Sequence, residues 1–76
     1  MSYRQLNDLP DSVQDVLPNH AQEIYQEAFN NAWNTYARPS DRKGNDDRET
    51  VAHKVAWSAV KHSYTKSNRG DWVRKN

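Results

Sequence analysis

The sequence predicts a mainly α-helical fold: a small three-helix domain with a long charged loop and a minimal β pairing of its termini. Two long stretches repeat apolar residues every three or four positions, the spacing that brings side chains to one face of a helix. Proline and glycine, which interrupt helices, occur only outside these two stretches. With 76 residues and no cysteine, residues 1–76 are expected to form a single domain without disulfides.

The first helix is predicted from about Pro10 to Leu17 (residues 10–17). Proline suits the first helical position, and Asp11 suits the positive end of the helix dipole. Pro18 ends this helix because the residue before a proline is pushed out of the helical region. The preceding residues, with Tyr3 among them, are too few for more than an extended arm.

The second helix is predicted from about His20 to Ala37 (residues 20–37), with Asn19 and Gln22 forming a pair like a capping box. Its apolar positions recur without interruption at Ala21, Ile24, Tyr25, Ala28, Phe29, Ala32, Trp33 and Tyr36. In a chain this short such aromatic side chains are expected to form the core rather than a ligand pocket. Replacing Trp33 or Trp57 by alanine is therefore expected to cost about 3–5 kcal/mol.

The third helix is predicted from about Asp47 to Lys66 (residues 47–66), begun by a pairing of Asp46 with Glu49 that also resembles a capping box. Apolar residues cover roughly two thirds of its circumference, so this helix is expected to be central and wrapped by its neighbours. One polar row is left for water: Asp47, Thr50, Lys54, Ser58, Lys61 and Thr65.

The remaining segments connect or follow the helices. Residues 38–46 contain no apolar side chain and are expected to form a charged, solvated loop between the second and third helices. Asn68 to Gly70 ends the last helix, and a short strand around Trp72 and Val73 is expected to pair with the N-terminal arm around Tyr3.

Charge is unevenly distributed along the chain. Residues 1–37 sum to −4 and residues 38–76 to +5, which together give the net charge of +1. If the two halves lie against each other, much of this asymmetry becomes internal complementarity. No run approaches the roughly 20 apolar residues of a membrane span, and the first residues do not resemble a signal peptide. A soluble protein of the cytoplasm, without membrane insertion, is the expectation.

The histidines and serines do not form a catalytic pattern, so an enzyme is not expected. His53 and His62 are nine positions apart, which places them on roughly opposite sides of a helix. His53 shares a row with Trp57 and Tyr64 and is best explained as an interior or boundary histidine with a hydrogen-bonded ring. Motifs such as GxSxG, HExxH and the P-loop are absent from the sequence.

The sequence suggests two kinds of binding site, one for a divalent cation and one on a cationic surface. The carboxylates of Asp41, Asp46 and Asp47 could hold a divalent cation weakly, although neighbouring cations neutralise them, and no other cofactor is expected. The candidate interaction surface is made of cationic side chains, namely Lys54, Lys61, Arg42 and Lys43. Nucleic acid would use Lys54 and Lys61 together with further cations near the C-terminus, namely Lys66, Arg69, Arg74 and Lys75.

Two blocks of the sequence closely resemble the ChaB family: DLPDSVQDVLPNHAQEIYQEAFNNAW (Asp8 to Trp33) and RETVAHKVAWSAVKHSYTK (Arg48 to Lys66). The most specific motifs are LPNHAQEIY and AHKVAW. The resemblance implies a compact helical domain and a non-enzymatic regulator of a membrane cation/proton antiporter of the ChaA type, acting by protein–protein contact from the cytoplasm. Family members encoded by baculoviruses are described as DNA-binding, so the alternative is a weak DNA-binding module that uses a basic helix face. The oligomeric state is left open.

Overall fold

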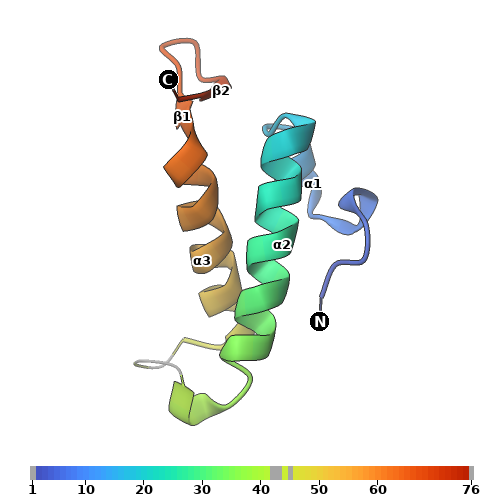
Figure 1. Ribbon diagram of the computed structural model, residues 1–76, viewed down its shortest axis with the longest axis vertical. Coiled ribbons are helices and arrows are strands. Elements are labelled where there is room, and N and C mark those ends of the chain that lie inside the picture. The colour runs from blue at the N-terminus through green and yellow to red at the C-terminus, as the bar shows by residue number, and fades with distance from the viewer. Residues whose placement is uncertain (1, 42–43, 45, 76) are drawn as a thin grey trace.

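The computed structural model describes residues 2–41, 44 and 46–75. Its elements follow one another as η1 (Leu6–Asp8), α1 (Asp11–Gln14), α2 (Asn19–Thr35), η2 (Pro39–Asp41), α3 (Arg48–Ser63), β1 (Tyr64–Lys66) and β2 (Trp72–Arg74). The predicted small three-helix fold is confirmed, and the two strands form a single small sheet (Figure 1).

Helix α2 lies at the centre of the molecule, between α3 on one side and the N-terminal segment with α1 on the other (Figure 1). It buries Ala21, Gln22, Tyr25, Phe29 and Ala32. The predicted capping pair does not form at its start. The Gln22 amide instead donates to the carbonyl of Leu17, at 2.8 Å, and so connects α2 to the end of the α1 segment.

The prediction that the third helix is central was wrong. Helix α3 buries only the three small or medium side chains Ala52, Ala56 and Val60, which face α2. The reason is that α1 has only four residues and packs with the N-terminal segment on the opposite side of α2. No other helix of the described residues therefore covers the outer side of α3.

The N-terminal arm binds α2 rather than a strand. The buried Tyr3 donates its backbone N–H to the Asn30 side-chain oxygen, at 2.8 Å, and its carbonyl accepts from the Asn30 amide, at 2.7 Å. The Tyr3 ring lies 4.5 Å from that of Phe29 between centroids. This segment thus covers the face of α2 that α3 does not reach.

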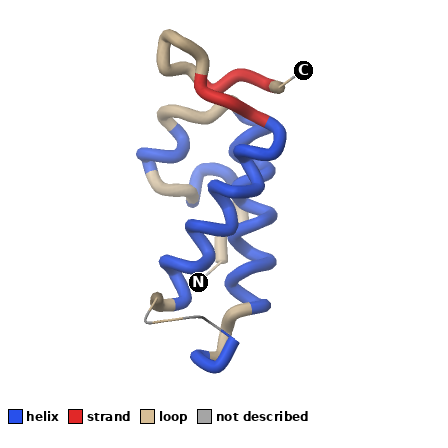
Figure 2. The backbone as a smooth tube through the Cα atoms, turned by 90° about the vertical axis from the view of Figure 1, so that its left-hand side faces the viewer, coloured by secondary structure: helices blue, strands red, loops and turns tan. Residues whose placement is uncertain are grey.

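The short C-terminal strand exists, but its predicted partner was wrong. β2 pairs antiparallel with β1, with Thr65 opposite Val73 (Figure 2). Because Tyr64 adopts extended angles (φ −131°, ψ 152°), α3 ends at Ser63 instead of continuing to about Lys66. Tyr64 is buried, and its hydroxyl is 2.9 Å from His20 Nδ1 at the start of α2.

Candidate interaction surface on helix α3

The outer side of α3 carries the polar row that the sequence predicted to face water. Lys54, Ser58 and Lys61 are all exposed. They stand on a helix whose opposite side packs through alanines, since Ala52 and Ala56 are fully buried. Small residues bring the two helix backbones close together and leave the larger side chains of α3 at its flanks and outer face.

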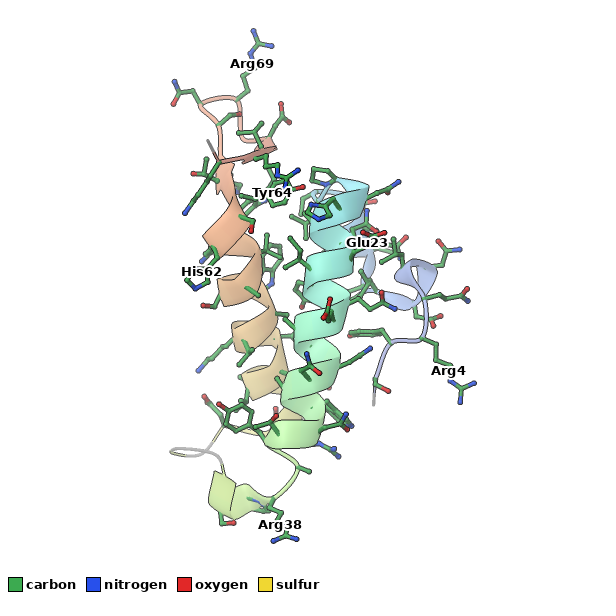
Figure 3. The ribbon with its side chains drawn as sticks, viewed as in Figure 1. Arg4, Glu23, Arg38, His62, Tyr64 and Arg69 are labelled. Atoms are coloured by element: carbon green, nitrogen blue, oxygen red, sulfur yellow. The ribbon has the colours of Figure 1, made fainter. Side chains whose placement is uncertain are left out.

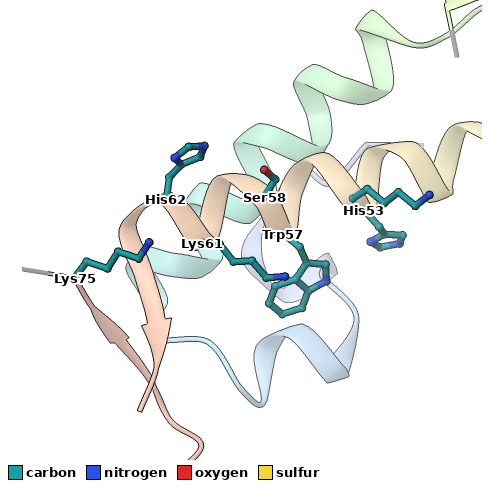
Figure 4. Close-up of a pocket in the computed structure, with 7 residues that line it drawn as sticks. His53, Trp57, Ser58, Lys61, His62 and Lys75 are labelled. Carbon is teal, nitrogen blue, oxygen red and sulfur yellow. The ribbon is translucent and has the colours of Figure 1, made fainter. Parts of the chain in front are cut away.

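Neighbouring hollows run along this outer side and are together called the α3 furrow. The central hollow, about 630 Å³, is lined by His53, Lys54, Trp57, Ser58, Lys61, His62 and Lys75 (Figure 4). A second hollow, about 510 Å³, shares Lys61 and Lys75 and extends to Trp72. A third, about 390 Å³, shares Lys54 and Ser58 and adds Val55 and Ala59.

The wall of the furrow is aromatic. Trp57 is half-buried and meets the buried Tyr25 ring edge-on, with centroids 5.3 Å apart. Its other neighbour is Trp72 of β2, at 5.6 Å between ring centroids. The backbone N–H of Lys75 donates to the Ser63 carbonyl at 2.9 Å, so the returning strand brings this lysine to the end of α3. The hairpin therefore completes the furrow.

His53 anchors the floor of the furrow to the core. Its Nδ1 is hydrogen-bonded to the Tyr25 hydroxyl, and its Nε2 lies 3.5 Å from a Glu49 carboxylate oxygen. The ring is half-buried, so the prediction of a boundary histidine with a hydrogen-bonded ring is confirmed. Burial, with smaller contributions from Tyr3 and Glu49, raises the pKa of Tyr25 above its ordinary value, so Tyr25 is a stable neutral partner at physiological pH.

The furrow is rich in unpaired positive charge. Lys54 pairs with Asp46, at 2.6 Å, whereas Lys61, Lys66 and Lys75 form no ion pair with any residue that the structure describes. Complementarity between the acidic first half and the basic second half is not seen in the charged contacts between described residues: the ion pair of Lys54 with Asp46 and the contact of His53 with Glu49 both lie within the second half. Figure 3 shows Glu23 on the side of α2 near the N-terminal segment and Arg69 on the hairpin.

The candidate metal ligands have other roles where the structure describes them. Asp46 binds Lys54, and Asp47 accepts a hydrogen bond from the Thr50 N–H, at 2.7 Å. Asp47, not Asp46, is thus the N-cap of α3. Within residues 2–41, 44 and 46–75, no three histidine, cysteine or acidic side chains are grouped to hold a metal. The Asp41 side chain lies outside the described part, so the weak cation site stays a prediction.

The other candidate residues divide between the furrow and the loop. Lys54 and Lys61 both line the central hollow. Arg42 and Lys43 lie outside the described residues.

Sequence reasoning placed Trp57 in the core, did not include Trp72 in any candidate site, and named Lys75 only among the cations of the nucleic-acid alternative. The available signal was the i, i+4, i+8 row of His53, Trp57 and Lys61, in which an aromatic lies between two polar residues, as at a helix boundary.

The sequence profile of the ChaB family matches residues 9–75. The chain belongs to the ChaB family. Relatives in Escherichia coli K12, Escherichia coli O157:H7 and Shigella flexneri, each named "Putative cation transport regulator ChaB", are 53% identical over 76 residues, the whole length of both chains.

A ChaB protein solved in solution by NMR has the same fold. It superposes with a TM-score of 0.80 at 53% identity and covers 97% of this chain and 99% of its own. The ChaB relatives carry the name of a regulator rather than that of an enzyme. Within the described residues, no helix is long and apolar enough to cross a membrane.

Proposed function

We propose that this ChaB protein is a non-enzymatic regulator of cation transport that acts by binding a membrane cation/proton antiporter of the ChaA type from the cytoplasmic side. The full-length similarity to proteins named as cation transport regulators supports the regulatory role. A regulator without a membrane-spanning helix would reach a transporter through the parts of that transporter that are exposed to water. A protein–protein contact is therefore the proposed mechanism.

The observation that carries this proposal is the α3 furrow. It gathers exposed cations around an indole wall, and it is open because nothing in the described chain covers the outer side of α3. Partly exposed tryptophan surrounded by polar groups is typical of the energetic centre of protein interfaces. Lys54 and Lys61, from the predicted interaction surface, stand on its rim.

The test is capture of the tagged protein from its own host at native level after brief crosslinking, with proteins identified by mass spectrometry and nucleic acid by sequencing. The Lys54→Ala/Lys61→Ala variant should recover less transporter than the unchanged protein. Arg4→Ala/Arg38→Ala is the matched control, because it removes the same charge from exposed residues away from the furrow (Figure 3).

Enrichment of a cation antiporter that survives nuclease treatment and falls only in the lysine variant supports the proposal. Recovery of DNA without any transporter, lost on nuclease treatment, would contradict it and favour the DNA-binding alternative. Salt gives a second distinction, since binding driven by phosphate contacts weakens steeply with rising salt, whereas a contact with buried apolar surface weakens less.

A further inference from the structure

We propose that the α3 furrow binds an acidic peptide segment that inserts an apolar side chain against Trp57 and Trp72. This inference rests on the proposed function, because it names the chemistry of the transporter segment that the furrow would take. The segment is a water-exposed stretch with carboxylates and at least one large apolar residue.

Charge argues for the carboxylates. Lys61 and Lys75 line both the central hollow and the hollow that extends to Trp72, and neither forms an ion pair with a described residue. Lys54 is already paired with Asp46, so the cations that are open to a ligand are those at the Lys61 and Lys75 end of the furrow. Carboxylates at alternate positions of an extended peptide point to the same side, so one segment can present two of them to Lys61 and Lys75.

Shape argues for the apolar side chain. The two indoles contact each other at 5.6 Å between centroids and remain only half-buried in this chain alone. On the other flank of the polar row, Val55 and Ala59 are also only partly buried and line the third hollow. Purely ionic recognition does not use such surfaces, whereas an inserted leucine or phenylalanine would cover them and remove apolar area from water.

The distribution of negative charge argues against nucleic acid as the occupant. Asp46 sits beside Lys54, and the exposed Glu49 sits beside His53, so the end of the furrow nearest the start of α3 is partly neutralised. A nucleic-acid strand carries a phosphate at every nucleotide and would meet these carboxylates. A peptide can place its carboxylates near Lys61 and Lys75 and leave the other end uncharged.

The experiment follows the three indole N–H signals of the full chain by NMR, assigned with Trp→Phe variants. The probe is an acetylated peptide of about eight residues, long enough to span the furrow, that contains glutamates and two leucines. We expect saturable shifts of the Trp57 and Trp72 signals and none of Trp33, which lies under Arg48 at the other end of α3. Trp33 thus serves as an internal reference.

Matched peptides and protein variants separate the contribution of charge from that of the apolar side chain. Lys61→Ala/Lys75→Ala should weaken binding roughly three- to tenfold, as expected for exposed charges, whereas Arg4→Ala/Arg38→Ala should leave it unchanged. Replacing the leucines of the peptide by serine should weaken binding without any change to the protein, so this arm does not depend on the folding of a tryptophan variant.

Absence of any indole shift would overturn the inference, as would equal binding of the serine peptide. DNA or phosphatidylglycerol vesicles that shift the same two signals more strongly than the peptide would also overturn it. The same shifts on concentrating the protein alone would make a second copy of this chain the occupant. Peptide binding without transporter capture would refute the proposed function alone, and capture of the transporter without peptide binding would refute this inference alone.

Discussion

Phe29 is the side chain on which the core depends most, and replacing it by alanine gives the sharpest test of the structure. It is 1% exposed and contacts rings from three segments: Tyr3 at 4.5 Å, His53 at 4.9 Å and Trp33 at 6.1 Å between centroids. Truncating a fully buried phenylalanine costs about 3–5 kcal/mol. A 76-residue domain has a free energy of unfolding of about 4–11 kcal/mol, at roughly 0.05–0.15 kcal/mol per residue. The substitution should therefore remove about a quarter or more of it.

The assay is urea denaturation followed by helical circular dichroism. With a denaturant dependence of about 1–1.5 kcal/mol per molar urea, the midpoint of Phe29→Ala should fall by at least about 2 M. Val16→Ala is the control, because Val16 is 46% exposed and its truncation should change stability by no more than about 0.5 kcal/mol.

A Phe29→Ala midpoint within experimental error of the unchanged protein would refute this account of the core.

The structure also revises the expectation for the tryptophans. Trp33 and Trp57 are only half-buried, so their alanine variants should lose less than Phe29→Ala, contrary to the equal and large cost expected from the sequence. If Trp57→Ala lost more free energy of unfolding than Phe29→Ala, the core would depend more on the contact of Trp57 with the hairpin than on Phe29 of α2.

Four further predictions concern single contacts. The raised pKa of Tyr25 favours its neutral form in the folded state, so the free energy of unfolding should be full below about pH 10 and fall above it by up to about 1.4 kcal/mol per pH unit. Denaturation at stepped alkaline pH would show this loss, and Tyr25→Phe should make it smaller. Arg48 donates to the Trp33 carbonyl at 2.7 Å, and its guanidinium stacks 4.0 Å from the centre of the Trp33 ring. Arg48→Lys should therefore lower the melting temperature and shift the Trp33 indole NMR signal, and an unshifted signal would exclude the stacking. Asp47→Ala should cost about 0.5–2 kcal/mol in chemical denaturation by removing the cap of α3, and Asp47→Asn should recover most of it. Gly70→Ala should cost about 1 kcal/mol in the same assay, because φ at Gly70 is +87°; an unchanged midpoint would mean that the turn relaxes at no cost.

The fold class could be predicted because the strongest pattern in the sequence, the helical spacing of apolar residues, is local. The three- and four-residue spacing from Ala21 to Tyr36 predicts a helix with one apolar face, and α2 buries that face. Its neighbour α3 was harder to judge, because periodicity measures how much of a helix is apolar and not how many neighbours exist to cover it. With α1 limited to four residues, the described part of the chain has no further helix to cover the outer side of α3.

Pairing with a later strand decided what the helical spacing alone could not. The helical spacing continues through Tyr64, so nothing nearby in the sequence ends α3 at Ser63. The end is set by β2, which arrives after the turn around Gly70 and pairs with Tyr64–Lys66. The same pairing brings Trp72 to Trp57, which is why the aromatic wall of the furrow was not predicted although the lysines on its rim were.

The separation of charge across α2 affects how the molecule approaches a partner. Three of the five acidic residues of the first half, Asp8, Asp11 and Asp15, belong to the N-terminal segment, which lies on the opposite side of α2 from α3 (Figure 1). Residues 38–76, which include α3 and the hairpin, sum to +5, so the molecule has an electric dipole whose positive pole lies on the side of the furrow. Near a negatively charged surface such a molecule turns its positive pole forward before contact, which shortens the orientational search. We therefore expect added salt to slow association with an acidic partner while changing the lifetime of the formed complex much less.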